Sequence, residues 1–123
     1  MAYKQLSRGN VEQTQVVIEA TEHYSEEEIA AACAVIKEAF GGYKWCTLCQ
    51  LRYHDNECLP IASSFADYHG IETENVIVIR GDFVSGKKEL NRPYILPNLH
   101  YDDFVWVLTR DNRDAQWRIA DAY

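Results

Sequence analysis

Four residues with the chemistry of metal ligands follow one another closely in the middle of the chain. They are Cys46, Cys49, His54 and Cys58, separated by two, four and three residues. Three thiolates and one imidazole can form a structural zinc site when all four converge on one ion. The spacing is one residue short of a zinc knuckle, which places four residues between its last two ligands.

The residues around the cysteine pair predict a strand rather than a metal-binding turn. Residues 45–53 are rich in aromatic and aliphatic side chains. Positions three apart on a strand point to opposite faces, so Cys46 and Cys49 cannot converge on one ion. A redox pair is disfavoured as well, because reactive Cys-x-x-Cys pairs lie at helix N-termini. We expect no metal and no cofactor, and reduced thiols unless the protein is exported.

A second set of residues could form an acid–base or ligand-binding cleft. Two carboxylates beside aromatic walls can act as an acid–base pair, but such a set is more often an ion pair beside core aromatics. We expect Arg80 to pair with Asp121 and assign no catalytic residue. The binding candidates are Tyr53, Arg80, Asp82, Trp106, Trp117 and Asp121.

Composition and charge exclude several classes of partner. The 123 residues carry a formal net charge of -7, which argues against nucleic acid and anionic membranes. No run approaches the roughly 20 apolar residues of a membrane span. The first ten residues lack the apolar core of a secretory signal. The protein is therefore expected to be cytoplasmic if the chain is complete, and exported if a leader has been removed.

The clearest local signal is the start of a helix at Ser25. Ser25 and Glu28 form a capping box, and Tyr24 and Ile29 stand at the positions of a hydrophobic staple. Apolar residues then recur at helical spacing up to Gly41. Cys33 lies on this stripe and is expected to be a buried small hydrophobe.

Further elements follow from the pattern. Residues 15–19 predict an edge strand or the start of a helical arm, 60–69 a second helix, and 75–84 a central strand. Residues 85–101 form a long connection, of a kind that is usually functional or mobile. Residues 104–110 and 115–123 predict a hairpin with a four-residue loop. That loop would pair Leu108 with Trp117, Trp106 with Ile119, and Phe104 with Asp121.

These elements predict an α+β fold in which two helices pack on one face of a mostly antiparallel sheet of four or five strands, ending in a long-stranded hairpin. We expect a single domain over residues 1–123, with 1–10 a loose lead-in.

Several segments resemble a family of small uncharacterised Firmicutes proteins, mainly clostridial. They include Tyr3-Lys-Gln-Leu6, Glu74-Asn-Val-Ile-Val-Ile79, Asp82-Phe-Val84 and the stretch from Trp106 to Tyr123. The family is similar in outline to cystatin-like and nuclear-transport-factor-like α+β domains. The resemblance implies that fold and no established reaction. Many of its members are exported or membrane-tethered.

The function expected from the sequence is a non-enzymatic interaction or small-ligand-binding module whose partner is an unknown protein or small molecule. One alternative is an immunity-type protein that neutralises a basic toxin, which would suit the acidic charge. Another is a small enzyme that uses Asp82 and Asp121 in an aromatic-lined cleft.

Overall fold

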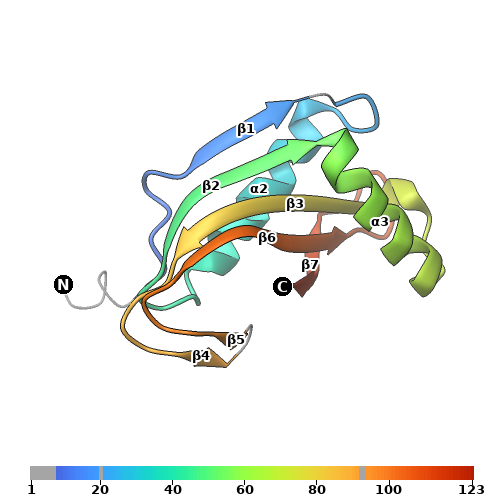
Figure 1. The fold of residues 1–123 in the computed structure, drawn as a ribbon. Coiled ribbons are helices and arrows are strands. Elements are labelled where there is room, and N and C mark those ends of the chain that lie inside the picture. Colours follow the sequence, from blue (N-terminus) through green and yellow to red (C-terminus); the bar gives the residue numbers. More distant parts are fainter. Residues whose placement is uncertain (1–7, 20, 92–93) are drawn as a thin grey trace.

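The computed structural model describes residues 8–19, 21–91 and 94–123, and the statements below concern these residues. A central sheet has the strand order β1-β2-β3-β6-β7 (Figure 1). Strands β1 and β2 are parallel and the other pairs are antiparallel. The predicted α+β class, with two helices packed against a mostly antiparallel sheet, is confirmed. The elements are β1 (Gln15–Glu19), α2 (Glu26–Phe40), β2 (Thr47–His54), α3 (Asp55–His69), β3 (Val76–Val84), β4 (Leu90–Asn91), β5 (Tyr94–Ile95), β6 (His100–Thr109) and β7 (Arg118–Ala122).

The start of α2 has the predicted capping box. The Glu28 amide donates to the Ser25 hydroxyl at 3.1 Å, and the Ser25 amide donates to the Glu28 carboxylate at 2.9 Å. Tyr24 and Ile29, the staple residues, are both buried. Local sequence therefore determines where α2 begins.

The two helices cover different faces of the sheet, which corrects the expectation that both lie on one face. Phe40 of α2 packs edge-on against Phe83 of β3. Helix α3 crosses the opposite side of the sheet (Figure 1). Its buried Cys58 lies close enough to Arg52 and Arg80, on that face, for their positive charges to oppose the rise that burial causes in its pKa. The first four residues of β3 are all buried because each face of that half is covered by a helix.

Helix α3 begins earlier than predicted. It starts at Asp55, directly after β2, and His54 caps it by accepting a hydrogen bond from the Asn56 amide at 3.1 Å. Pro60 lies inside the helix and does not mark its start. The extra turn brings Cys58 onto the buried stripe that continues with Ala62 and Ala66. Packing of this stripe therefore outweighs the tendency of proline to mark the start of a helix.

The register predicted for the final hairpin is wrong. Leu108 pairs with Ile119 and Trp106 with Ala122, and a bulge follows Val107. The connection runs from residue 110 to 117 instead of 111 to 114, so Trp117 precedes β7. Trp117 still points towards α2, because its indole donates to the Glu28 carbonyl at 3.1 Å. The contact of Trp117 with α2 keeps this residue out of β7 and so lengthens the connection. Rules for hairpin loops consider only the loop residues and cannot include such a contact.

Two further segments refine the sequence interpretation. Of the two alternatives for residues 15–19, an edge strand or the start of a helical arm, the structure has the edge strand, β1. The connection 85–101 is not structureless, since β4 and β5 pair within it and β6 already begins at His100. Residues 1–7 of the predicted lead-in lie outside the described residues, whereas Asn10 forms a parallel bridge with Thr47.

Candidate functional site

The sheet separates the predicted cleft residues into two groups. Tyr53, Trp106 and Trp117 are buried on the side of α2. Their polar atoms are bound there: the Tyr53 hydroxyl donates to Asp55 at 2.6 Å, and the Trp106 indole donates to the Tyr43 hydroxyl at 3.3 Å. Burial, reinforced by Asp55, raises the pKa of Tyr53. These aromatic side chains form core and do not line an open cleft.

The charged members of the predicted cleft lie on the other face and do not converge. Arg80 and Asp82 belong to β3, and Asp121 belongs to β7, two strands away and level with Val78. Strand geometry then places Asp82 and Asp121 about 16 Å apart. Arg80 lies 3.8 Å from the carboxylate of Asp103, its partner in place of Asp121. An acid–base pair of Asp82 and Asp121 has no support from this arrangement.

A β-bulge brings a new carboxylate to this face. Gly81 pairs with Phe104 and Phe83 with Tyr101, so Asp102 and Asp103 together oppose Asp82. Asp103 adopts a left-handed backbone, with φ of 60°. Aspartate tolerates this conformation better than most residues. Bulges of this kind redirect side chains at the rim of a sheet.

An arginine from β2 holds the bulge in place. Arg52 binds Asp82 at 2.9 Å and also forms an ion pair with Asp103. The Asp103 amide donates to the Asp82 carboxylate at 2.9 Å. The side chains of three strands are thus bound together at the base of the bulge. Among the described residues, no cation pairs with the neighbouring Asp102.

An open groove lies beside this bulge, and we call it the hairpin groove. Its volume is about 430 Å³, enough for one or two side chains of a ligand. Aromatic rings supply most of its wall, and two carboxylates stand at its side. The lining residues are Tyr94, Tyr101, Asp102, Asp103, Phe104, Ala122 and Tyr123.

The segment that carries Tyr94 is pinned to the sheet. The Ser85 amide donates to the Leu99 carbonyl at 2.8 Å, and the Ser85 hydroxyl donates to the Leu96 carbonyl at 2.7 Å. The Leu96 amide donates to the Tyr101 hydroxyl at 2.8 Å. The side chain of Tyr94 on this segment is nevertheless 63% exposed. Tyr123, on the other side of the groove, is 58% exposed.

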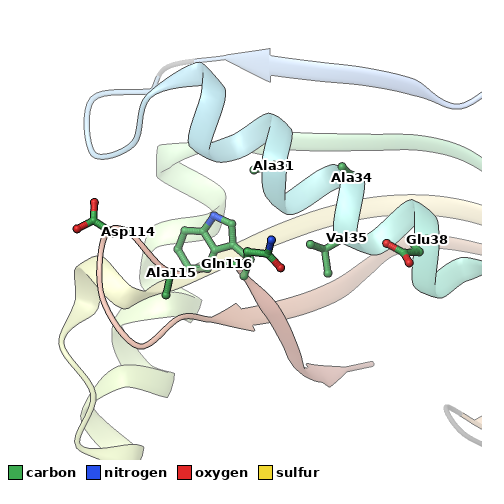
Figure 2. Close-up of a pocket in the computed structure, with 8 residues that line it drawn as sticks. Ala31, Ala34, Val35, Glu38, Asp114, Ala115 and Gln116 are labelled. Atoms are coloured by element: carbon green, nitrogen blue, oxygen red, sulfur yellow. The ribbon is translucent and has the colours of Figure 1, made fainter.

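A second groove, the helix groove, separates α2 from the connection that leads into β7 (Figure 2). Its volume is about 400 Å³. The α2 side carries the small residues Ala31 and Ala34, and Figure 2 shows Gln116 facing Val35 across the groove. Glu38 and Asp114 add a carboxylate from each side.

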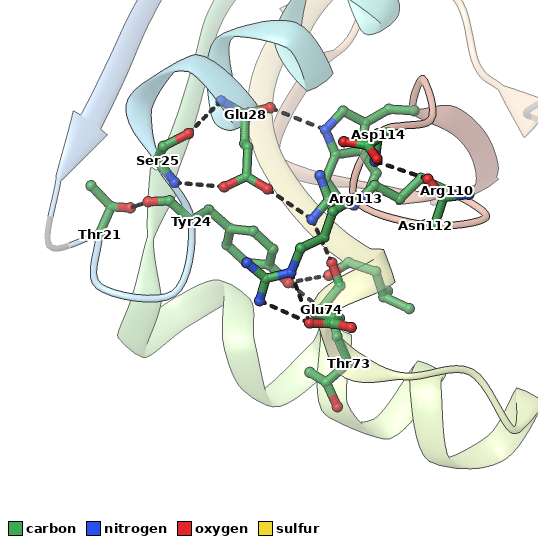
Figure 3. A network of polar contacts seen from close by, with 12 residues as sticks. Thr21, Tyr24, Ser25, Glu28, Thr73, Glu74, Arg110, Asn112, Arg113 and Asp114 are labelled. Carbon is green, nitrogen blue, oxygen red and sulfur yellow. Dashed lines mark hydrogen bonds and ion pairs between the residues drawn. The ribbon is translucent and has the colours of Figure 1, made fainter.

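The polar network around Arg110 is structural (Figure 3). The Arg110 side chain is only 3% exposed, forms an ion pair with Glu28 at 2.7 Å and donates to the Glu74 carbonyl at 2.8 Å. Its guanidinium lies over the Trp117 ring, 4.2 Å from the centroid. Burial raises the pKa of the adjacent Tyr24 to about 12. These contacts bind the start of α2 to the connection before β7.

The cysteines and histidines do not assemble into a metal centre. Cys46 is buried just before β2, whereas Cys49 is exposed on it and Cys58 is buried on α3. Across the described ranges, no three histidine, cysteine or acidic side chains gather as a metal site. None of the helices described is long and apolar enough to cross a membrane.

Sequence reasoning missed the hairpin groove, although it had marked residues 85–101 as a long connection of a kind that is usually functional or mobile. The available signal was local: Tyr94 and Tyr101 lie close to the pair Asp102-Asp103. Comparison with protein-family models, curated proteins and solved structures finds no match for this chain. The candidate site therefore rests on its geometry and chemistry.

Proposed function

We propose that this protein is a non-enzymatic interaction module that binds a basic segment of a protein partner. We call the binding site the docking surface. It consists of the hairpin groove and the exposed side chains of Leu96 and Leu99 on the neighbouring segment. The observation that carries the proposal is the combination, in one groove, of aromatic walls with Asp102, an acidic residue that pairs with no cation in the described part of the chain. Aromatic rings beside carboxylates favour lysine and arginine side chains, which combine an apolar stem with a cationic end.

The distribution of exposed apolar side chains supports this location. The described residues expose six large hydrophobic side chains, and four of them belong to the docking surface: Tyr94, Leu96, Leu99 and Tyr123. Apolar side chains that gather on the surface of a soluble domain often mark a contact with another protein. Tyrosine is also one of the residues enriched in such contacts.

Charge supports a basic partner. The chain has a net charge of -7, and opposite charge on a partner accelerates association. The second candidate, an immunity-type protein that neutralises a basic toxin, is a special case in which the partner is a folded basic protein. In either case, binding should weaken as ionic strength rises. Membership of the clostridial family and likeness to cystatin-like domains remain hypotheses.

A selection from a random peptide library on the immobilised protein tests the proposal. We expect the enriched peptides to contain lysine or arginine next to aliphatic or aromatic residues. Their affinity, measured by calorimetry, should fall at least tenfold for the double variant Tyr94→Ser and Tyr123→Ser. Tyr68→Ser is the matched control, since Tyr68 is 85% exposed on α3. Peptides that bind the double variant as well as the wild type would refute the docking surface.

A further inference from the structure

Strand β7 is the last strand of the sheet, so one of its sides carries backbone groups that no strand of the central sheet pairs. Tyr123 exchanges two backbone hydrogen bonds with Val105, at 2.6 and 2.9 Å. Because successive residues of a strand direct their backbone groups to alternate sides, those of Ala122 point to the free side. The Ala122 amide donates to the side chain of Asp121 at 2.9 Å.

This contact gives Asp121 a role other than catalysis. Its carboxylate occupies an edge amide that a neighbouring chain could otherwise use, and a bulge in the same strand leaves Ala120 without a register partner. Charged side chains and bulges are two means by which proteins prevent indiscriminate pairing at sheet edges. The edge of β7 is thus protected but not covered, as the exposure of Arg118, Ala120 and Asp121 confirms.

The two grooves lie at opposite ends of this strand. The helix groove is lined by Trp117, one residue before β7, and the hairpin groove is lined by Ala122 and Tyr123 at the other end of the strand. Each groove combines aromatic residues with acidic ones: Trp117 with Glu38 and Asp114 in the helix groove, and the tyrosines with Asp102 in the hairpin groove. By contrast, the opposite edge strand, β1, lines neither groove.

We infer that the partner's basic segment binds as a sixth strand along β7 and places a side chain in each groove. The inference rests on the proposed function and specifies its binding mode. Main-chain hydrogen bonds would supply affinity, and the grooves would select side chains. The five residues of β7 span about 17 Å. The segment should therefore be extended, with five residues between its two basic residues, and should displace the Asp121 carboxylate from the Ala122 amide.

A designed peptide that carries only the expected features of the segment tests this binding mode. The probe is acetyl-Lys-Val-Thr-Val-Thr-Val-Lys-amide, and the same peptide with glutamate at both ends is the charge control. Two further peptides carry backbone N-methyl groups, one on its valines and the other on its threonines. Only one of these sets can face β7, because alternate amides of a strand point to opposite sides.

Binding as a strand predicts that one N-methylated peptide loses at least tenfold in affinity, while the other binds like the lysine probe. The glutamate peptide should bind at least tenfold more weakly than the lysine probe. Equal binding by both N-methylated peptides would overturn strand addition and leave the docking surface intact, as would equal loss by both. A lysine probe that does not bind at all would count against both the inference and the proposed function.

Amide hydrogen exchange provides a readout on the protein itself. With the lysine probe at saturation, exchange at Ala122 should slow at least tenfold, whereas exchange at Val17 on the opposite edge should not change. The variant Ala122→Pro removes an amide hydrogen that points away from β6. It should therefore lower the affinity for the lysine probe at least tenfold with little change in the unfolding midpoint of the protein. If this variant does not fold, the exchange experiment still decides. Unchanged exchange at Ala122 in the bound state would overturn the inference.

Discussion

The Arg110 guanidinium, buried under the connection before β7, forms a 2.7 Å ion pair with Glu28, the residue that closes the capping box of α2. One carboxylate thus satisfies an orphan amide at the start of a helix and neutralises a buried cation from the connection that follows β6. Removal of one partner from such a pair leaves the other charge without compensation, which is strongly destabilising.

Glu28→Gln should lower the free energy of unfolding by about 2 kcal/mol, less than for a fully buried pair because Glu28 is partly exposed. Glutamine preserves the capping box, so the loss reports on the ion pair. Chemical denaturation at pH 7 measures it. Glu27→Gln removes the same charge from the same helical turn and should change stability by less than about 0.5 kcal/mol. Equal effects of the two variants would mean that the ion pair contributes nothing.

The same pair makes stability depend on pH. Burial alone would raise the pKa of Glu28, but the Ser25 amide and Arg110 together lower it below its ordinary value of 4.5. A lowered folded-state pKa stabilises the protein above pH 4.5, and this contribution is lost as the pH falls through the folded-state value. The stability difference between wild type and Glu28→Gln should therefore be constant near neutrality and shrink below pH 4.5. A constant difference down to pH 3 would contradict this assignment.

Ser25→Ala tests the other half of the capping box. The hydroxyl accepts the Glu28 amide, and its loss should lower the free energy of unfolding by about 1 kcal/mol. Ser64→Ala, at an exposed position inside α3, should not destabilise, because alanine is the better helix former. An unchanged denaturation midpoint for Ser25→Ala would mean that the cap does not stabilise α2.

Thiol labelling should distinguish Cys49 from the other three cysteines. Cys49 is exposed, whereas Cys33, Cys46 and Cys58 are buried. Burial raises the pKa of Cys33 to about 11 and also raises the pKa of Cys46 and Cys58, which leaves little reactive thiolate. The native protein should react rapidly at one thiol per chain and at four after denaturation. The rapid phase should vanish in Cys49→Ser and persist in Cys33→Ser.

Metal analysis tests the interpretation of the cysteine pair. Cys46 is buried before β2 and Cys49 is exposed on it, so the purified protein should contain no stoichiometric zinc. One zinc per chain that is lost in Cys46→Ser would show that the segment rearranges to bind metal, and the strand would then be wrong.

The sequence by itself determined the features that depend on neighbours along the chain. The start of α2 was predicted because Ser25 and Glu28 are three residues apart and bond to each other. The central strand was predicted at 75–84 and found at Val76–Val84, since a run that is apolar on both faces suits a strand covered on both sides. The α+β class followed from the order of such elements.

Only the tertiary structure decided which distant residues meet. Tyr94 and Tyr123 line one groove although 29 positions separate them, and no local pattern connects them. The bulge at Asp102 and Asp103 depends on an arginine from another strand, and the register of β7 depends on where Trp117 docks against α2. Pairing between strands is set by the packing of the whole sheet, and a small slip moves every side chain that follows. For this reason the predicted cleft separated, and the groove beside β7 emerged only from the fold.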